Sequence, residues 1–199
     1  MPLGTPTMPI ATALLAYLLG SIPFGLLVTR LFGLGDLRGI GSGNIGATNV
    51  LRTGNRLAAL LTLVGDVGKG AVAVIVARLL MGEFAGLLAG AAAFVGHCFP
   101  IYLRFRGGKG VATFLGTVLA LAWPLGLAAC ATWLATAMLS RISSLAALVA
   151  AALAPFYALV VGADALAVVL ALMGALIFVR HRANIGRLIA GTEPRIGKK

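Results

Sequence analysis

Long apolar runs, separated by short polar segments, make up most of the chain. Residues 10–28 hold no charged side chain and are long enough to cross the hydrocarbon core of a membrane. Residues 111–139 are too many for one untilted crossing, and Trp123-Pro124 at their middle favours two spans joined by a tight turn. The pattern predicts seven transmembrane helices, at about residues 10–28, 57–81, 85–103, 111–122, 125–139, 145–161 and 165–179.

We therefore expect an all-α polytopic membrane protein that forms a single integral membrane domain over residues 1–199. Residues 1–9 carry no Lys or Arg, so they lack the basic region of a cleaved signal peptide. With seven spans, 14 of the 16 Lys and Arg residues fall on one side of the membrane, and Arg78 alone falls on the other. The positive-inside rule places the basic side in the cytoplasm, with the N-terminus outside and the C-terminus inside.

Composition narrows the class of protein further. The chain is 60% hydrophobic and 11% charged, which excludes a disordered chain and argues against a soluble domain. Its net charge of +11 suits anionic lipid or an anionic substrate. No soluble domain is left to hold a basic face for nucleic acid, so we expect no nucleic-acid partner. The two cysteines lie in apolar runs and suggest neither a disulfide framework nor a metal site.

The first cytoplasmic loop combines glycines with short polar side chains. Glycines let backbone N–H groups approach an anion closely, and arginine binds phosphate through two parallel hydrogen bonds. The spacing spells G-x-G-x-x-G, but no strand precedes it, so a dinucleotide site is a poor interpretation. A flexible connector is the other alternative. We expect phosphate contacts from Gly41, Ser42, Gly43, Asn44, Thr48, Asn49 and Arg52.

The second cytoplasmic loop surrounds one lysine with three glycines. Gly107, Gly108 and Gly110 flank Lys109, a pattern that favours an anion-binding nest with a point charge at its centre. The next span begins directly after this loop, so its N-terminal amides can face the same anion. The alternative is a basic loop with glycine hinges. The spacing does not match that of a P-loop.

Two later segments carry further candidates. Ser144 can donate to a phosphate oxygen or cap the helix that follows, and the cap is the simpler interpretation. In the tail, a helix would place His181, Asn184 and Arg187 near one face, and Gly191 is a natural stop signal. The alternative is a basic segment that rests on anionic lipid headgroups.

Three ionisable residues fall inside or near the ends of predicted spans. Asp66 and Lys69 lie three residues apart, where an ion pair that orients the helix is slightly favoured over a functional role. His97 near the end of its span is either catalytic or a brace for the following loop.

The motif segments 41–49, 107–113 and 180–185 resemble those of the bacterial acyl-phosphate:glycerol-3-phosphate acyltransferases, in order and with matching spacing. Asp66, Lys69, His97 and Glu193 also fit that family's pattern. The resemblance covers nearly the whole chain. The His-x4-Asp motif of other glycerolipid acyltransferases is absent, because no acid follows His97 at this spacing.

The resemblance implies a seven-span enzyme of the bacterial inner membrane, with its active site facing the cytoplasm. It implies transfer of a fatty acyl group from acyl phosphate to the 1-hydroxyl of glycerol 3-phosphate, without a cofactor or metal. A soluble enzyme that makes acyl phosphate is a candidate partner. The implied catalytic residues are Ser42, Lys109, His181 and Asn184, and the implied substrate-binding residues include Arg52, Ser144, Arg187 and Glu193.

Two questions stay open at the level of sequence. Either His181 or a phosphate oxygen of the substrate can take the hydroxyl proton, and the substrate is slightly favoured because no carboxylate is obviously placed to orient His181. Glu193 is the one exception. The rival function is a transporter of a phosphorylated solute, although the candidate polar residues cluster on one side only.

Overall fold

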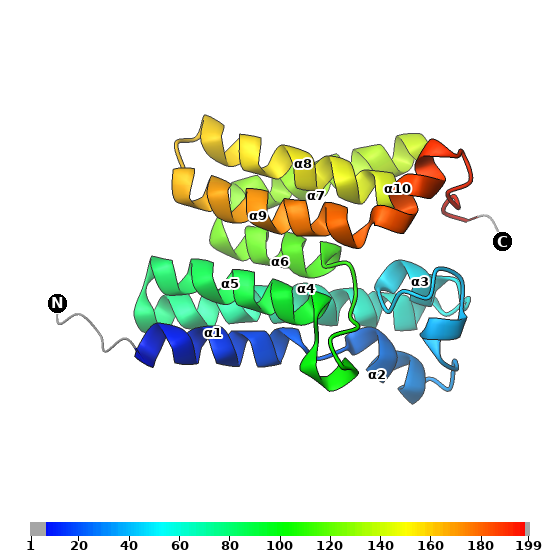
Figure 1. Cartoon of the computed structure of the whole chain (residues 1–199), viewed down its shortest axis with the longest axis horizontal. Coiled ribbons are helices and arrows are strands. Elements are labelled where there is room, and N and C mark those ends of the chain that lie inside the picture. Colours follow the sequence, from blue (N-terminus) through cyan, green and yellow to red (C-terminus); the bar gives the residue numbers. More distant parts are fainter. Residues whose placement is uncertain (1–6, 198–199) are drawn as a thin grey trace. The chain divides into compact units, whose positions relative to one another are not determined.

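The structure is a computed structural model, and it describes residues 7–197. Every regular element in this range is a helix (Figure 1), which confirms the all-α expectation. The chain divides into two compact units, Met1–Leu121 and Ala122–Lys199. A single domain over residues 1–199 therefore stays a prediction.

The first unit is built around one long helix, α4. This helix packs against both α5 and α6, and α1 packs against α5. The elements of the unit are α1 (Thr7–Gly20), α2 (Phe24–Leu31), η1 (Leu37–Gly39), α3 (Ala47–Leu51), α4 (Arg56–Met81), α5 (Glu83–Cys98), η2 (Ile101–Leu103) and α6 (Val111–Leu121).

Small residues allow these helices to approach closely. A side-chain carbon on Gly116 of α6 would run into the backbone of Val67 in α4, and one on Gly20 of α1 would run into the backbone of Ala93 in α5. Close backbone approach at glycine and alanine is typical of helices that associate in lipid, where no hydrophobic effect drives them together. The glycines inside the apolar runs therefore mark the helix contacts.

The first predicted span is not one continuous helix. Helix α1 ends at Gly20 and α2 begins at Phe24, yet Met8–Leu31 together form one apolar segment long enough to cross a membrane, in agreement with the predicted span. Pro23 has no N–H to donate to the preceding turn. The carbonyl oxygen of Ile22, in the break, instead accepts a hydrogen bond of 2.8 Å from the Lys69 ammonium.

The third apolar run is a candidate span over Glu83–Leu103, as expected, but it is not one α-helix throughout. Helix α5 ends at Cys98 rather than near residue 103, and η2 follows. Pro100 disfavours helix in the residue before it, which explains the early end. The break inside residues 111–139 is present, but it falls at Ala122, so Trp123 and Pro124 lie in the first turn of α7 rather than in the turn. Proline is well suited to that position because its missing N–H would have no partner there.

The second unit consists of four helices. They are α7 (Trp123–Ser140), α8 (Ser143–Val160), α9 (Asp164–Arg180) and α10 (Arg182–Ile189). Helix α8 packs against both α7 and α9. Pro155 inside α8 cannot donate to the carbonyl of Ala151, and Gly174 of α9 packs against that same carbonyl. The chain bends by 64° between α9 and α10.

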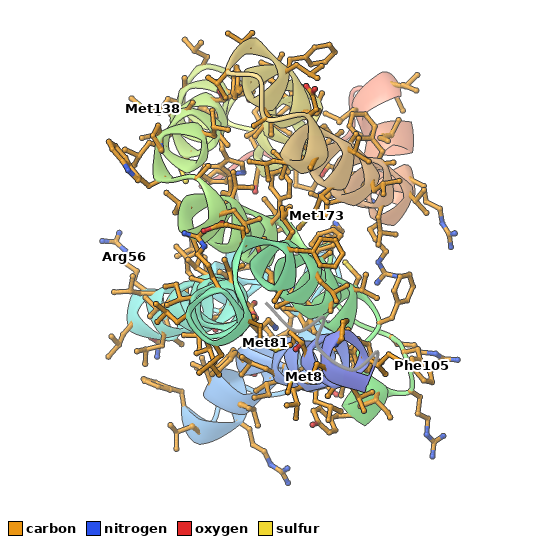
Figure 2. All side chains as sticks on the ribbon, turned by 90° about the vertical axis from the view of Figure 1, so that its left-hand side faces the viewer. Met8, Arg56, Met81, Phe105, Met138 and Met173 are labelled. Carbon is orange, nitrogen blue, oxygen red and sulfur yellow. The ribbon has the colours of Figure 1, made fainter. Side chains whose placement is uncertain are left out.

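By length and composition, five helical segments of the described residues are able to cross a membrane, or six if the bent pair α9 and α10 counts as one span. Helix α6 is a shorter apolar helix. Figure 2 shows mostly carbon side chains projecting outward from the helices, and large apolar residues such as Leu79, Leu139 and Val160 are largely exposed. Such a surface suits lipid rather than water. The count of seven spans stays a prediction.

Candidate functional site

In the first unit, the two motif loops lie at the same end of the helices. Helices α4 and α5 follow one another as a hairpin, so the start of α4 and the end of α5 are neighbours. The loop that contains α3 precedes α4, and the loop that contains η2 follows α5 and leads into α6 (Figure 1). The fold therefore collects the candidate residues of both loops at one end of this unit.

Asn49 organises the first loop from within. Its side chain is buried, and its amide group donates to the carbonyl oxygens of Leu37, Ile40 and Asn44 at 2.8 to 3.0 Å. The loop is therefore a folded unit and not the flexible connector of the alternative interpretation. Because the amide hydrogens are used by the loop itself, the geometry favours a positioning role for Asn49 over direct substrate contact.

The side-chain oxygen of Asn49 accepts hydrogen bonds from two of the predicted substrate residues. It accepts from the backbone N–H of Ser42 at 3.2 Å and from the Arg52 guanidinium at 3.3 Å. The side chains of Ser42 and Arg52 are both exposed. Gly41, with φ of +53°, lies directly beneath Asn49 and Arg52, so a larger residue would collide with both. The loop thus ties the backbone of Ser42 and the guanidinium of Arg52 to the same oxygen.

The other residues predicted in this loop have different surroundings. Thr48 is exposed and Asn44 is half-buried. Gly43 takes a left-handed conformation with φ of +68°, which a side chain would strain. Thr48 is exposed at the start of α3, and its predicted contact with the substrate stays a prediction.

The glycines of the second loop are required by close packing. Gly107 lies against the carbonyl oxygens of His97 and Cys98, Gly108 against the His97 ring, and Gly110 against the Phe94 ring. The N–H of Gly108 donates to the carbonyl oxygen of His97 at 3.0 Å. The loop is therefore fixed to the end of α5 and does not act as a glycine hinge.

Lys109 is the only residue of 107–110 with a side chain, and it is half-buried. The flanking glycines hold its backbone against α5. The position of the Lys109 Cα is therefore fixed, which limits the space that the ammonium can occupy. This arrangement fits the predicted point charge in a tight loop. Direct contact of Lys109 with phosphate stays a prediction.

A buried cluster of charge lies behind this loop. The ammonium of Lys69 is 2.8 Å from Oδ1 of Asp66, and Nδ1 of His97 is 3.4 Å from the same oxygen. All three side chains are buried. The favoured ion pair between Asp66 and Lys69 is therefore present. His97 touches both this pair and the second loop, which supports its interpretation as a brace.

In the second unit, the polar candidates converge on Glu193. Its carboxylate accepts hydrogen bonds from the Ser144 hydroxyl at 2.7 Å, from the Asn184 amide and from the Arg187 guanidinium at 2.6 Å. Ser144 is the second residue of α8, and the N-cap position is held by Ile142. The interpretation of Ser144 as a helix cap is therefore wrong. The tail thus folds back onto the start of α8.

The tail helix agrees closely with its sequence. Helix α10 places Asn184 and Arg187 on one face, where both reach Glu193, but His181, predicted on the same face, lies at the bend before this helix. It ends at Ile189, and Gly191 follows with φ of +70°, which confirms the predicted stop. A tail that only rests on lipid headgroups would not need this internal set of hydrogen bonds.

His181 at the bend between α9 and α10 is oriented by the backbone. Its Nδ1 lies 2.8 Å from the carbonyl oxygen of Ile177, and the side chain is buried. A carbonyl oxygen only accepts, so the hydrogen of the neutral ring is on Nδ1 and the lone pair is on Nε2. The orienting group that the sequence lacked is therefore a main-chain carbonyl.

Burial raises the pKa of Glu193, but the hydrogen bonds from Ser144, Asn184 and Arg187 outweigh it and hold the pKa below its ordinary value of 4.5. The carboxylate is therefore ionised at neutral pH. A carboxylate repels a phosphate group, and this one is already engaged by three donors, so the geometry favours a positioning role for Glu193 over substrate contact.

Among residues 7–197, no group of three or more His, Cys, Asp or Glu side chains is arranged to hold a metal ion. Two main-chain partners were missed by sequence reasoning, the carbonyl groups of Ile22 and Ile177. The proline after Ile22 and the lysine inside the second span together hinted at the first. No residue pattern pointed to the second.

Comparisons with known proteins agree on one family. The sequence model of the family described as glycerol-3-phosphate acyltransferase matches residues 10–191. The chain is 68% identical to the glycerol-3-phosphate acyltransferase of Jannaschia sp. (strain CCS1), over 94% of this chain and 92% of the relative. It is 67% identical to that of Dinoroseobacter shibae, again over 94% and 92%.

Two solved structures are similar in fold. One is a crystal structure of PlsY, an integral membrane glycerol 3-phosphate acyltransferase, in its glycerol 3-phosphate form, with a TM-score of 0.90, 38% identity and 96% of each chain covered. The other is the lysphosphatidic acid form of PlsY, with a TM-score of 0.88, 37% identity and the same coverage. The similarity supports an integral membrane fold for this chain.

We expect the Glu193 cluster to hold the tail in a pH-dependent manner. The pKa of Glu193 is lower in the folded protein than its ordinary value of 4.5, so its hydrogen bonds stabilise the tail fully above that pH and are lost as the pH falls through the lowered value. Hydrogen exchange of residues 182–197, corrected for intrinsic rate, should therefore accelerate on acidification.

The variant Glu193→Gln should exchange in this segment at least about tenfold faster than the parent at pH 7, because charge-assisted hydrogen bonds contribute roughly 1.5–3 kcal/mol each. Its dependence on pH should largely disappear. Asp36→Asn is the matched control, since Arg38 lowers the pKa of Asp36 to about 2 on an exposed loop of the other unit. Equal exchange in parent and Glu193→Gln at pH 7 would contradict this account.

Proposed function

We propose, because the chain belongs to the glycerol-3-phosphate acyltransferase family, that it moves a fatty acyl group from acyl phosphate to the 1-hydroxyl of glycerol 3-phosphate. The products are lysophosphatidate and inorganic phosphate. One observation carries the proposal. A protein of the same fold, 38% identical over 96% of this chain, has been crystallised in forms with glycerol 3-phosphate and with lysphosphatidic acid.

The proposed reaction needs placement and charge screening more than a protein nucleophile. The 1-hydroxyl oxygen attacks the acyl carbon, the new C–O ester bond forms, and the bond between the acyl carbon and the phosphate oxygen breaks. Phosphate leaves with that electron pair, and the hydroxyl proton passes to a base. Acyl phosphate is already activated, so two anionic substrates that repel each other are the main obstacle.

Cationic side chains and backbone amides of the first unit can reduce the repulsion between the two anionic substrates. Ser42 and Arg52 are presented together by Asn49, and the guanidinium can bind phosphate through two hydrogen bonds. Lys109 adds a compact charge from a loop fixed to α5. We assign Arg52 and Lys109 to neutralising substrate phosphates and the charge that develops on the leaving group. Ser42 donates a hydrogen bond beside them.

In the second unit, His181 and Asn184 are assigned to substrate contact, and Ser144, Arg187 and Glu193 to holding Asn184 in place. Glu193 accepts from Asn184, which turns the amide and fixes the helix on which it lies. His181 is fixed by Ile177, a neutral carbonyl. A carboxylate in that position would make the imidazole a stronger base. We therefore assign the proton to a phosphate oxygen of the substrate rather than to His181.

The proposed setting is the bacterial inner membrane, with the motif loops facing the cytoplasm. The uneven distribution of Lys and Arg between loops supports this orientation. Acyl phosphate would come from a soluble enzyme on the same side. A transporter of a phosphorylated solute is the competing function, and uptake into vesicles without product formation would favour it.

Purified protein given glycerol 3-phosphate and acyl phosphate should form lysophosphatidate, and Lys109→Ala should lose most of this turnover while it still inserts and purifies. Lys109→Arg should restore little, because a planar guanidinium does not replace a compact ammonium in a tight loop. Arg56→Ala is the control, because Arg56 begins α4 and its side chain points away from the helices (Figure 2). Near-normal turnover in Lys109→Ala would return this residue to a simple basic loop.

The variant His181→Gln tests the identity of the base. If a substrate phosphate takes the proton, the variant should keep its maximal rate within about tenfold of the parent, since loss of a true general base costs roughly 10²–10⁴-fold. Its KM should change more, and the limb of the pH–rate profile near neutrality should remain, because phosphate monoesters titrate near about pH 6. A collapse of kcat with unchanged substrate affinity would make His181 the base.

Topology can be measured by cysteine labelling in a background of Cys98→Ala and Cys130→Ala. Arg106→Cys, on the exposed second loop, should be labelled only when the reagent reaches the cytoplasm. Ala163→Cys, between α8 and α9, should be labelled from the opposite side. Labelling of both positions from the same side would overturn the proposed orientation.

A further inference from the structure

The buried cluster of Asp66, Lys69 and His97 has no part in the proposed reaction, yet it contacts the loop that carries Lys109. Ionisable groups inside membrane helices are costly and are usually retained for function or held by specific partners. Here all three side chains are buried, Lys69 contacts Ile22 outside the cluster, and the His97 ring contacts Gly108. Those neighbours show what the cluster holds in place.

The chain of contacts begins at the break in the first span. Lys69 donates to the carbonyl oxygen of Ile22 at 2.8 Å and lies 2.8 Å from Asp66. The same carbonyl oxygen also accepts from the backbone N–H of Phe24 at 3.2 Å, so Lys69 adds a second, charged donor to a backbone group in the break. The lysine therefore joins a broken helix to a buried carboxylate.

Asp66 in turn fixes the ring of His97. Its Oδ1 lies between the Lys69 ammonium and Nδ1 of His97, at 2.8 and 3.4 Å. At 3.4 Å this contact is electrostatic rather than a hydrogen bond, and the negative carboxylate favours a hydrogen on the Nδ1 that faces it. The opposite edge of the ring then faces the second loop. A side-chain carbon on Gly108 would meet Nε2 of His97 before any other atom.

The loop rests on this ring directly beside Lys109. Gly107 and Gly108 lie on His97, and Gly110 lies on Phe94 and Cys98, so the backbone is supported on both sides of the lysine. Phe94 is a rigid apolar support. His97 is the polar support, and its orientation depends on Asp66 and Lys69.

We infer that Asp66, Lys69 and His97 are positioning residues that set where the Lys109 ammonium is presented. This inference rests on the proposed role of Lys109 in binding substrate phosphate. A displacement of about 1 Å of a charged group can change a rate by about 100-fold. The cluster therefore acts on the reaction through the loop and not by touching the substrate.

The variant His97→Asn tests the inference. Its shorter amide can still face Asp66, but it no longer fills the space under Gly108 that the ring occupies. The main-chain hydrogen bond from Gly108 to residue 97 remains, so the variant removes only the ring under the loop. We expect affinity for glycerol 3-phosphate to fall about tenfold in protein with Lys109 and by less than about twofold in a Lys109→Ala background, because a residue that acts through Lys109 has nothing left to position. Equal losses in both backgrounds would overturn the inference, as would no loss in the first.

Hydrogen exchange of residues 104–111 provides a readout that does not need the substrate. It should be faster in His97→Asn, with residues 40–52 and the melting temperature unchanged. Unaltered exchange in the second loop overturns the inference. If the parent protein does not bind glycerol 3-phosphate, the proposed function is overturned. Faster exchange of the second loop in His97→Asn would then still show that His97 positions this loop.

A replacement variant covers the case in which His97→Asn misfolds, and a second variant serves as the control. If His97→Asn does not fold, Asp66→Leu combined with Lys69→Met takes its place, because removal of both charges leaves no buried charge unpaired. The same effects on the second loop and on affinity are expected. Thr62→Val is the matched control, since Thr62 is equally buried in α4 but donates to its own helix at Ala58. It should change neither readout by more than about twofold.

Discussion

The ion pair between Asp66 and Lys69 is the interaction on which the first unit depends. In an apolar surrounding, a charge is stable only when another charge or several hydrogen bonds neutralise it. Lys69 meets this constraint with Asp66 and with the carbonyl of Ile22, which the proline-containing break leaves without a helical donor. The pair therefore supports both the break between α1 and α2 and the position of His97 under the second loop.

The same constraint explains how the chain uses its few acids. Four of the five acidic residues pair with a cation close by in sequence, as Asp36–Arg38, Asp66–Lys69, Arg78–Glu83 and Arg187–Glu193. The fifth, Asp164, lies in the first turn of α9, where a negative charge is favoured by the helix dipole. Each acid thus has a structural neighbour, and the surplus of positive charge falls to the loops. Two anionic substrates would need such a surplus.

How far the sequence predicts this structure depends on the range of the interaction. Helix α4 and the end of the tail helix follow from local patterns, namely an apolar run and a glycine that stops a helix. The break after Gly20 was missed, because its stabilising partner, Lys69, is 47 residues from Ile22. The hydrogen bond of His181 with Ile177 was missed for another reason, since a carbonyl group carries no side-chain signature. The sequence identifies the candidate residues by type. Only the three-dimensional structure separates those that can contact the substrate from those that hold other residues in place.

The glycines of the second loop have a packing role in addition to the one that their sequence pattern suggests. In the sequence, Gly107, Gly108 and Gly110 suggest a nest of amides around an anion. In the structure, each is small because another group occupies the space that its side chain would fill. The two roles are compatible, since a backbone laid flat on α5 also cannot move away from a bound phosphate. A loop fixed in this way does not have to be ordered when the substrate binds, so its conformational entropy is lost on folding rather than on binding. A rigid loop that carries one lysine is therefore better suited to screening a phosphate than a mobile loop with several.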